Sequence, residues 1–271
     1  MLPDFVFWLS LILKMAVTAG FVVGAAMVTE RAGPVVGALI ATLPIAAAPA
    51  YFFLALNHDA AFIAQSALGS IAAHTATGVF AVIYAALAQR RSMGVSVAGA
   101  LATWLAIALL MRRVEWAFPA LAAVNLAVFA VCVALAERYR HAPMPPVARR
   151  WYDVPLRAVM VALLVAAVVG LSNRVGPTLT GLLAIFPIVL TCLMLIFQPR
   201  VGGPATAALI SNTLWALVGL SVALFVLHLA TVPLGTAAGL SLALATSVAW
   251  NFGLWRLRRR SGASTAAQRR P

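Results

Sequence analysis

The chain has 271 residues, of which 64% are hydrophobic and only 9% charged, and its mean hydropathy is +1.03. A water-soluble domain carries about 25% charged residues, so the composition excludes an ordinary soluble fold and places most of the chain in a lipid bilayer. The net charge of +13 could suit nucleic acid, but the basic residues lie in short clusters between apolar runs, a pattern typical of membrane topology. We therefore expect the lipid bilayer, and no nucleic acid, as a partner.

Apolar runs long enough to cross a bilayer follow one another along the whole chain. A crossing helix needs about 20 such residues, and nine runs qualify, at about residues 5–28, 35–56, 61–88, 95–111, 118–136, 155–172, 178–197, 204–230 and 236–255. Asp4 stands where a signal peptide would carry basic residues, so we expect the first run to be retained. The prediction is an all-α, polytopic membrane protein with about nine transmembrane helices.

Arginine placement orients these helices. With the N-terminus outside, fifteen of the nineteen basic residues fall on the inner side of the membrane, where they normally accumulate. We predict an N-out/C-in, multi-pass protein of the bacterial inner (plasma) membrane.

One stretch occurs twice. Residues 31–45 and 174–188 align without a gap, and seven of the fifteen positions are identical. The identities include an Arg, a Gly and two Pro, which apolar bias alone would not align. Five predicted helices separate the starts of the two copies, so the copies enter the bilayer from opposite sides. The sequence thus predicts an inverted repeat of the form 4+1+4 with Pro-broken helices.

The predicted organisation follows from this duplication. Residues 1–112 form repeat 1 with four helices, and residues 113–154 hold the fifth helix and a basic, proline-containing cytoplasmic linker. Residues 155–257 form repeat 2, and residues 258–271 form a basic tail that we expect to be disordered.

The second copy also carries a family resemblance. Its core, Gly-Leu-Leu-Ala-Ile-Phe-Pro at residues 181–187, precedes a short basic turn and a run containing Ser211 and Trp215. This pattern resembles the GlpM-like small inner-membrane proteins. The first copy departs from it, with Leu43 in place of the Phe and His74 where Trp215 falls. The resemblance implies a tandem duplication of a unit of about four helices and names no substrate.

Two prolines mark the candidate site. Pro44 and Pro187 fall about ten residues into their predicted helices, where each removes a backbone hydrogen bond and frees a carbonyl that must find a partner or line a wet cavity. Paired, Pro-interrupted helices in two inverted halves are the strongest sequence indication of a transporter's binding site. A plain kink is the alternative.

A second group of candidates precedes each broken helix. An Arg beside a Gly-Pro helix start forms an anion-attracting corner. An arginine that anchors the chain at the lipid headgroups is the alternative, and it suits Arg31, on the inner side, better than Arg174, on the outer side. The residues are Arg31, Gly33 and Pro34 in the first copy and Arg174, Gly176 and Pro177 in the second.

Polar residues inside the apolar runs complete the candidate set. His74 lies mid-run, where it could couple transport to protons or, more commonly, make an interhelical hydrogen bond. Ser211 and Asn212 belong to the densest polar cluster. Lys14 and Arg157 correspond to each other when the alignment of the two copies is extended toward the N-terminus. Lys14 either faces a cavity or reaches the membrane interface from a surface-lying first segment.

These observations favour transport over catalysis. All six acidic residues fall at run ends or in loops, so a cation exchanger lacks its intramembrane carboxylate. No motif of an enzyme, metal site or cofactor site is present. We predict a secondary transporter (permease) of a small, anionic or neutral solute that alternates access between its inverted repeats. The alternatives are a phosphorylated-lipid carrier or flippase and a non-transporting scaffold subunit, and a homodimer is a candidate assembly.

Overall fold

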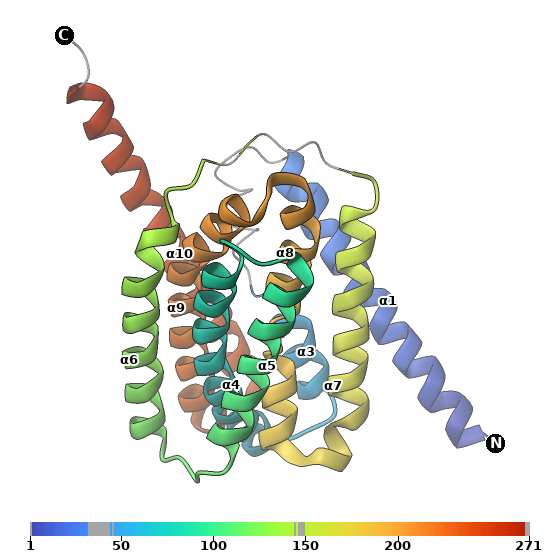
Figure 1. The fold of residues 1–271 in the computed structure, drawn as a ribbon. Coiled ribbons are helices and arrows are strands. Elements are labelled where there is room, and N and C mark those ends of the chain that lie inside the picture. Colours follow the sequence, from blue (N-terminus) through green and yellow to red (C-terminus); the bar gives the residue numbers. More distant parts are fainter. Residues whose placement is uncertain (1, 32–43, 45, 144, 146–149, 269–271) are drawn as a thin grey trace.

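The computed structural model describes residues 2–31, 44, 46–143, 145 and 150–268. It is all-helical, with 87% of residues in helices. The first half contains α1 (Leu2–Arg31), α3 (Ala47–Ala55), α4 (Ala60–Leu87) and α5 (Met93–Arg112), and the short 3₁₀ helix η1 (Glu137–Tyr139) follows α6 (Phe118–Ala136). The second half contains α7 (Asp153–Ala184), α8 (Ile188–Val201), α9 (Gly203–Leu234) and α10 (Thr236–Gln268). The helices form one bundle whose termini lie at opposite ends (Figure 1).

Within the described residues, seven helices are long and apolar enough to cross a membrane. They confirm a multi-pass membrane protein, and α6 spans the same residues, 118–136, as the sequence predicted. The two remaining predicted crossings, about 35–56 and 178–197, correspond to shorter pieces. The first reaches the described chain only at Pro44 and α3, and the second consists of the end of α7 followed by α8. The count of nine crossings therefore stays a prediction.

Helix α4 is the centre of the bundle. In its most apolar window 78% of the residues are buried, against 11% in α1. It packs on α5, α6, α7 and α9. Its start is capped by Asp59, whose carboxylate accepts a hydrogen bond from Phe62 N at 2.8 Å, which satisfies one of the free N–H groups of the first turn.

Helices α4 and α9 run antiparallel along their full lengths. Gly203, at the start of α9, lies against Ala88, just past the end of α4. Halfway along, His74 Nε2 lies 2.9 Å from Leu217 O, and toward the other end His228 Nδ1 lies 2.8 Å from Ala64 O. Polar side chains therefore bind the two helices together at two depths.

Helix α7 is two segments joined by a sharp corner. Gly176 has φ 76° and ψ 174°, a conformation open only to glycine, and Pro177 begins the second segment, as the fixed φ of proline favours. The second segment and α8 return toward the end at which α7 began, since Arg200 in the last turn of α8 contacts Asp153, the first residue of α7.

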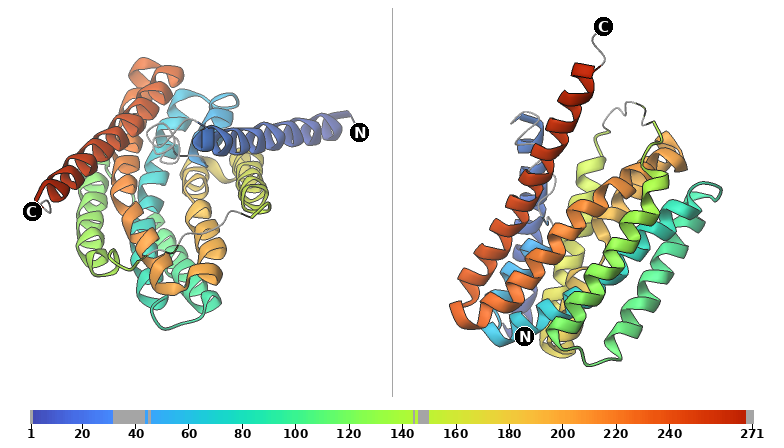
Figure 2. Two further views of the ribbon diagram at one scale, coloured as in Figure 1. Left: turned by 90° about the horizontal axis from the view of Figure 1, so that it is seen from above. Right: turned by 90° about the vertical axis from the view of Figure 1, so that its left-hand side faces the viewer.

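The helix α10 continues as far as Gln268, into the tail from residue 258 that the sequence predicts to be disordered. Alanine, arginine and glutamine, which are good helix formers, make up much of this tail and account for the difference. The ends of α1 and α10 project from the bundle in different directions (Figure 2).

Candidate functional site

The return path from Gly176 is interrupted at Pro187. Proline has no N–H to donate to the Leu183 carbonyl, and Phe186 N donates to that oxygen instead at 3.1 Å. The helix restarts at Ile188, and Thr191 N donates to Pro187 O at 2.9 Å. The predicted proline break is therefore a true discontinuity between α7 and α8 rather than a smooth kink.

Two glycines bring the backbone of this path against α4. A Cβ atom on Gly181 would lie 1.8 Å from Ser66 O, and a Cβ atom on Gly69 would lie 2.3 Å from Thr178 O. Both distances are far below van der Waals contact, so no side chain fits at either position. The second segment of α7 and the N-terminal half of α4 thus touch backbone to backbone.

A chain of buried hydroxyls ends on the interrupted helix. Ser70 Oγ donates to Gly181 O at 2.7 Å. Since that proton is used, Tyr51 OH donates to Ser70 Oγ, also at 2.7 Å. Gly181 lies in the last turn before the break, and Ile185 N, the usual helical donor to its carbonyl, donates to Leu183 O instead. The hydroxyls of α3 and α4 therefore satisfy a carbonyl that the break would otherwise leave unpaired in an apolar environment.

The first copy has the same local pattern at Pro44. Ala48 N donates to Pro44 O at 2.8 Å, and Ala48 corresponds to Thr191 when the two copies are aligned. The helix α3 begins at Ala47, within the turn that this bond closes. Each proline thus precedes a helix that starts within the bundle.

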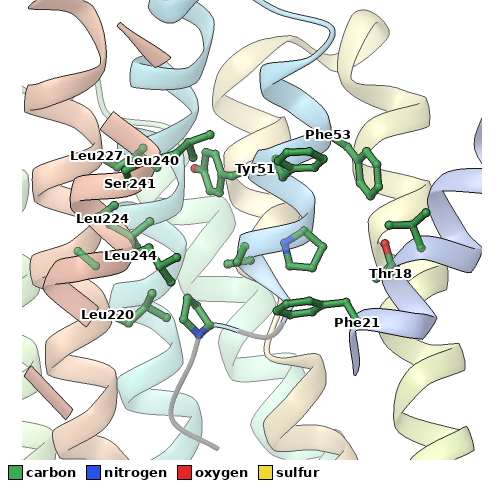
Figure 3. A pocket seen from close by; sticks show the side chains of 18 residues that line it. Thr18, Phe21, Tyr51, Phe53, Leu220, Leu224, Leu227, Leu240, Ser241 and Leu244 are labelled. Atoms are coloured by element: carbon green, nitrogen blue, oxygen red, sulfur yellow. The ribbon is translucent and has the colours of Figure 1, made fainter. Parts of the chain in front are cut away.

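A cavity of about 490 Å³ lies beside Pro44. It is bounded by α1, α3, α9 and α10, and Figure 3 shows leucines of α9 and α10 facing Thr18 and Phe21 of α1 across α3. Its lining is mostly aliphatic and aromatic, with hydroxyls only at Thr18, Tyr51 and Ser241 among the described residues. A cavity of this volume and apolar character is typical of a small-molecule site.

His74 lies at the centre of the α4–α9 contact. Its side chain is fully buried, and its ring lies 4.9 Å from that of Phe129 on α6. Nε2 faces the Leu217 carbonyl and therefore donates, while Nδ1 has no hydrogen-bond partner among the described residues. This geometry is that of the interhelical hydrogen bond, the commoner of the two sequence alternatives.

Ser211 and Asn212 are adjacent in the sequence, but their side chains differ in their hydrogen-bond partners. Ser211 Oγ is buried and has no partner within the described part of the chain. Asn212 Oδ1 accepts from Arg140 Nε at 3.0 Å, so it joins α9 to the residue that follows η1. Neither residue lines the cavity.

The corner residues of the second copy lie near one end of the bundle. The Arg174 side chain is exposed, and Gly176 and Pro177 make the turn itself. In the first copy, Gly33 and Pro34 lie outside the described residues, and of Arg31 only the backbone, at the end of α1, is described. Of the predicted site residues that the structure describes, Pro44 alone is among those that line the cavity.

His58, in the loop between α3 and α4, is a titratable group outside the helices that could cross the membrane. Burial lowers its pKa, and the nearby Asp59 carboxylate opposes the shift. The His58 Nε2 atom lies 2.8 Å from Ser172 Oγ, which links this loop to α7. The contact therefore fixes the end of α3 against the helix that carries the glycine corner.

Within the described residues, no group of three or more His, Cys, Asp or Glu side chains could hold a metal ion. The carboxylates whose side chains are described, Asp59, Glu115, Glu137 and Asp153, all lie at helix ends or in loops. The cavity can therefore attract a ligand by apolar contact and by hydroxyl groups rather than by negative charge.

Several site residues were missing from the sequence prediction. Tyr51, Ser70 and Gly181 become a unit only through the fold, since they come from three different helices. Their sequence signals were the position of Gly181 within the repeated stretch, of Tyr51 shortly after Pro44, and of Ser70 opposite Ser211 when the two copies are aligned. Comparison with known protein families, characterised proteins and solved structures finds no match. The resemblance to GlpM-like proteins therefore stays a prediction.

Proposed function

We propose that the protein is a secondary transporter of a small anionic or neutral solute in the bacterial inner membrane. The observation that carries this proposal is the interruption of the bundle at Pro187, held by the Tyr51–Ser70–Gly181 hydrogen-bond chain close to a cavity lined by Pro44 and Tyr51. Interrupted helices at membrane depth are tolerated where they line a cavity and recur at the substrate sites of transporters. The described residues that line the cavity include no carboxylate, which argues against a metal cation as substrate.

Alternating access would arise from two inverted halves of four helices each, with α6 between them. The antiparallel packing of α4 on α9 supports this arrangement, since these are corresponding helices of the two predicted repeats. The matching hydrogen bonds after Pro44 and Pro187 support it too. Rocking of one half against the other would expose the cavity to each side in turn.

The inverted arrangement makes a direct prediction about topology. With one cysteine introduced at Arg31 or at Arg174, a membrane-impermeant maleimide added to intact cells should label the Arg174→Cys protein and leave the Arg31→Cys protein unlabelled until the cells are opened. The native Cys132 and Cys192 are buried and serve as the unlabelled background. Labelling of both positions from one side would contradict the inverted repeat.

Transport itself is tested in liposomes. Purified protein should accelerate the efflux of at least one member of a trapped mixture of small organic anions, measured by mass spectrometry against protein-free liposomes. Ser70→Ala leaves the Gly181 carbonyl without its donor at a cost of about 1–3 kcal/mol. We therefore expect this variant to slow the efflux about tenfold, because the break loses the geometry in which it binds solute.

Ser96→Ala is the matched control. Ser96 is also fully buried, but its hydroxyl donates to Ser92 O on its own helix, at 2.9 Å, away from the break. It should transport as the unmodified protein does. Equal efflux rates in the Ser70→Ala and Ser96→Ala proteins would show that the hydrogen-bond chain does not contribute to transport. If no anion of the mixture moved, the transporter proposal would be refuted.

A further inference from the structure

The cavity offers apolar contact and little else. Of the three hydroxyl-bearing residues in its described lining, Thr18 donates to Lys14 O at 2.8 Å and Tyr51 donates to Ser70. Both hydroxyl protons are therefore already committed within the protein. What remains for a ligand is the Ser241 hydroxyl and a lining made mostly of leucine, phenylalanine, alanine and proline, which favours a hydrocarbon chain over a polar molecule.

The cavity opens sideways. Its rim includes Phe21, Phe52 and Leu244, whose side chains are 42%, 54% and 45% exposed. Phe21 lies well inside the 30-residue helix α1, and Leu244 lies eight residues, or about 12 Å, past the start of α10. At these depths the surroundings are acyl chains rather than water, so a hydrocarbon chain can enter from the bilayer between α1 and α10.

A cation lies one helical turn from this opening. Lys14 precedes the lining residues Val17, Thr18 and Phe21 by three, four and seven positions, which puts it on the same face of α1. Its side chain is half-buried, and its ammonium group has no acidic partner among the described residues. An unpaired ammonium group within a membrane helix marks a functional site by default.

We propose that the cavity binds an amphipathic anion, with its hydrocarbon chain between α1, α3 and α10 and its anionic headgroup, such as a phosphate monoester, at Lys14. This inference rests on the proposed function, because it takes the cavity as the carrier's substrate site, and it names the class of substrate. Arg157, the repeat counterpart of Lys14, lies on α7 near the opposite end from the corner, and its Nε is buried without a partner within the described chain. It supplies the equivalent headgroup position when the second half opens.

Binding is measured by equilibrium dialysis with the protein in phosphatidylcholine nanodiscs, against empty nanodiscs. The probes are radiolabelled n-decyl phosphate, inorganic phosphate and n-decanol. Decyl phosphate should bind at least tenfold more tightly than either other probe, since it alone has both a hydrocarbon chain and an anionic headgroup. Lys14→Gln should weaken its binding about tenfold, and Lys14→Arg should restore it. Ala243→Phe, which fills the cavity, should weaken the binding of decyl phosphate and the binding of decanol alike.

Matched variants control for charge and bulk. Arg112→Gln removes an exposed cation elsewhere, and Ala245→Phe adds the same bulk to an exposed position of α10 outside the lining, so both should bind as the unmodified protein does. Equal affinity for decyl phosphate and inorganic phosphate, or unchanged binding in both Lys14→Gln and Ala243→Phe, overturns the inference. If binding fails while liposomes still transport a water-soluble anion, only this inference falls. If binding holds without any transport, the transporter proposal falls instead.

Discussion

Gly181→Ala should prevent stable folding. The added Cβ atom would lie 1.8 Å from the Ser66 carbonyl oxygen and 2.9 Å from Ser70 N. Both contacts are to backbone atoms in the N-terminal half of the buried helix α4, which cannot rotate away as a side-chain end can. Overpacking a core typically costs about 1–3 kcal/mol, and we expect this substitution to exceed that range because two helices must move apart.

The measurement is the unfolding midpoint of the purified protein in detergent, together with the monodisperse fraction on size exclusion. Gly69→Ala should behave similarly. Gly69 lies on α4 in the same contact with α7, and its added Cβ atom would lie 2.3 Å from Thr178 O.

Gly170→Ala is the control on the same helix. There the new Cβ atom would meet only Leu11 Cδ1, at 3.9 Å, an ordinary contact. Alanine is favoured over glycine in a helix by about 0.5–1 kcal/mol, so this variant should be as stable as the unmodified protein or slightly more stable. If the Gly181→Ala and Gly170→Ala proteins had the same unfolding midpoint, α4 and the second segment of α7 would not lie backbone to backbone.

How far the sequence predicts this fold depends on the length of each apolar run. Runs bounded by charges or prolines, such as 118–136, are confirmed almost to the residue, because bilayer thickness fixes their length. The corner at Gly176 and the break at Pro187 were also foreseeable, since glycine and proline act through local backbone geometry. The number of crossings was harder to establish, because interrupted helices appear as short pieces.

The site was less predictable than the fold. His74, Ser211 and Asn212 were chosen because they are polar within apolar runs, yet the structure does not bring them together. His74 bonds to Leu217 on α9, Asn212 bonds to Arg140, and Ser211 has no hydrogen-bond partner within the described residues. Polarity shows that a side chain needs a partner, and only tertiary packing determines which one. Tyr51 meets Ser70 and Gly181 because α3, α4 and α7 converge, and no local spacing encodes that convergence.

The second large effect is expected at the ion pair between Asp153 and Arg200. Arg200 NH1 donates to Asp153 Oδ2 at 2.8 Å, and NH2 donates to Oδ1, so the guanidinium holds the carboxylate with two parallel bonds. The two side chains are only 14% and 11% exposed. Removing one partner of such a pair leaves the other charge poorly solvated and is strongly destabilising.

The pair also has an architectural role. It joins the first residue of α7 to the last turn of α8, and between these points the chain is interrupted twice, at Gly176 and Pro187. The ion pair thus closes a hairpin that two breaks would otherwise leave free to open. The equivalent positions of the first half, in the alignment of the two copies, are the uncharged Ser10 and Asn57. The two halves are therefore clamped unequally, and we expect the first half to supply more of the motion.

Asp153→Asn should lower the unfolding midpoint by about 5–10 °C, measured on purified protein in detergent. Arg200→Lys should lower the unfolding midpoint by less, because an ammonium group keeps the charge although it cannot form both parallel bonds. Glu137→Gln is the control. It breaks the exposed Glu137–Arg140 pair, in which the Glu137 side chain is 53% exposed, and should leave the midpoint unchanged.

Reversing the two charges should rescue stability only in part. Asp153 lies in the first turn of α7 and Arg200 in the last turn of α8, so each native charge has the opposite sign to the partial charge of its helix end. In Asp153→Arg/Arg200→Asp the pair could re-form, but each new charge would meet a helix end of like sign. A double variant as unstable as Asp153→Asn would show that the two groups do not pair, whereas full recovery would show that the helix ends contribute nothing. An intermediate midpoint is the result that the geometry requires.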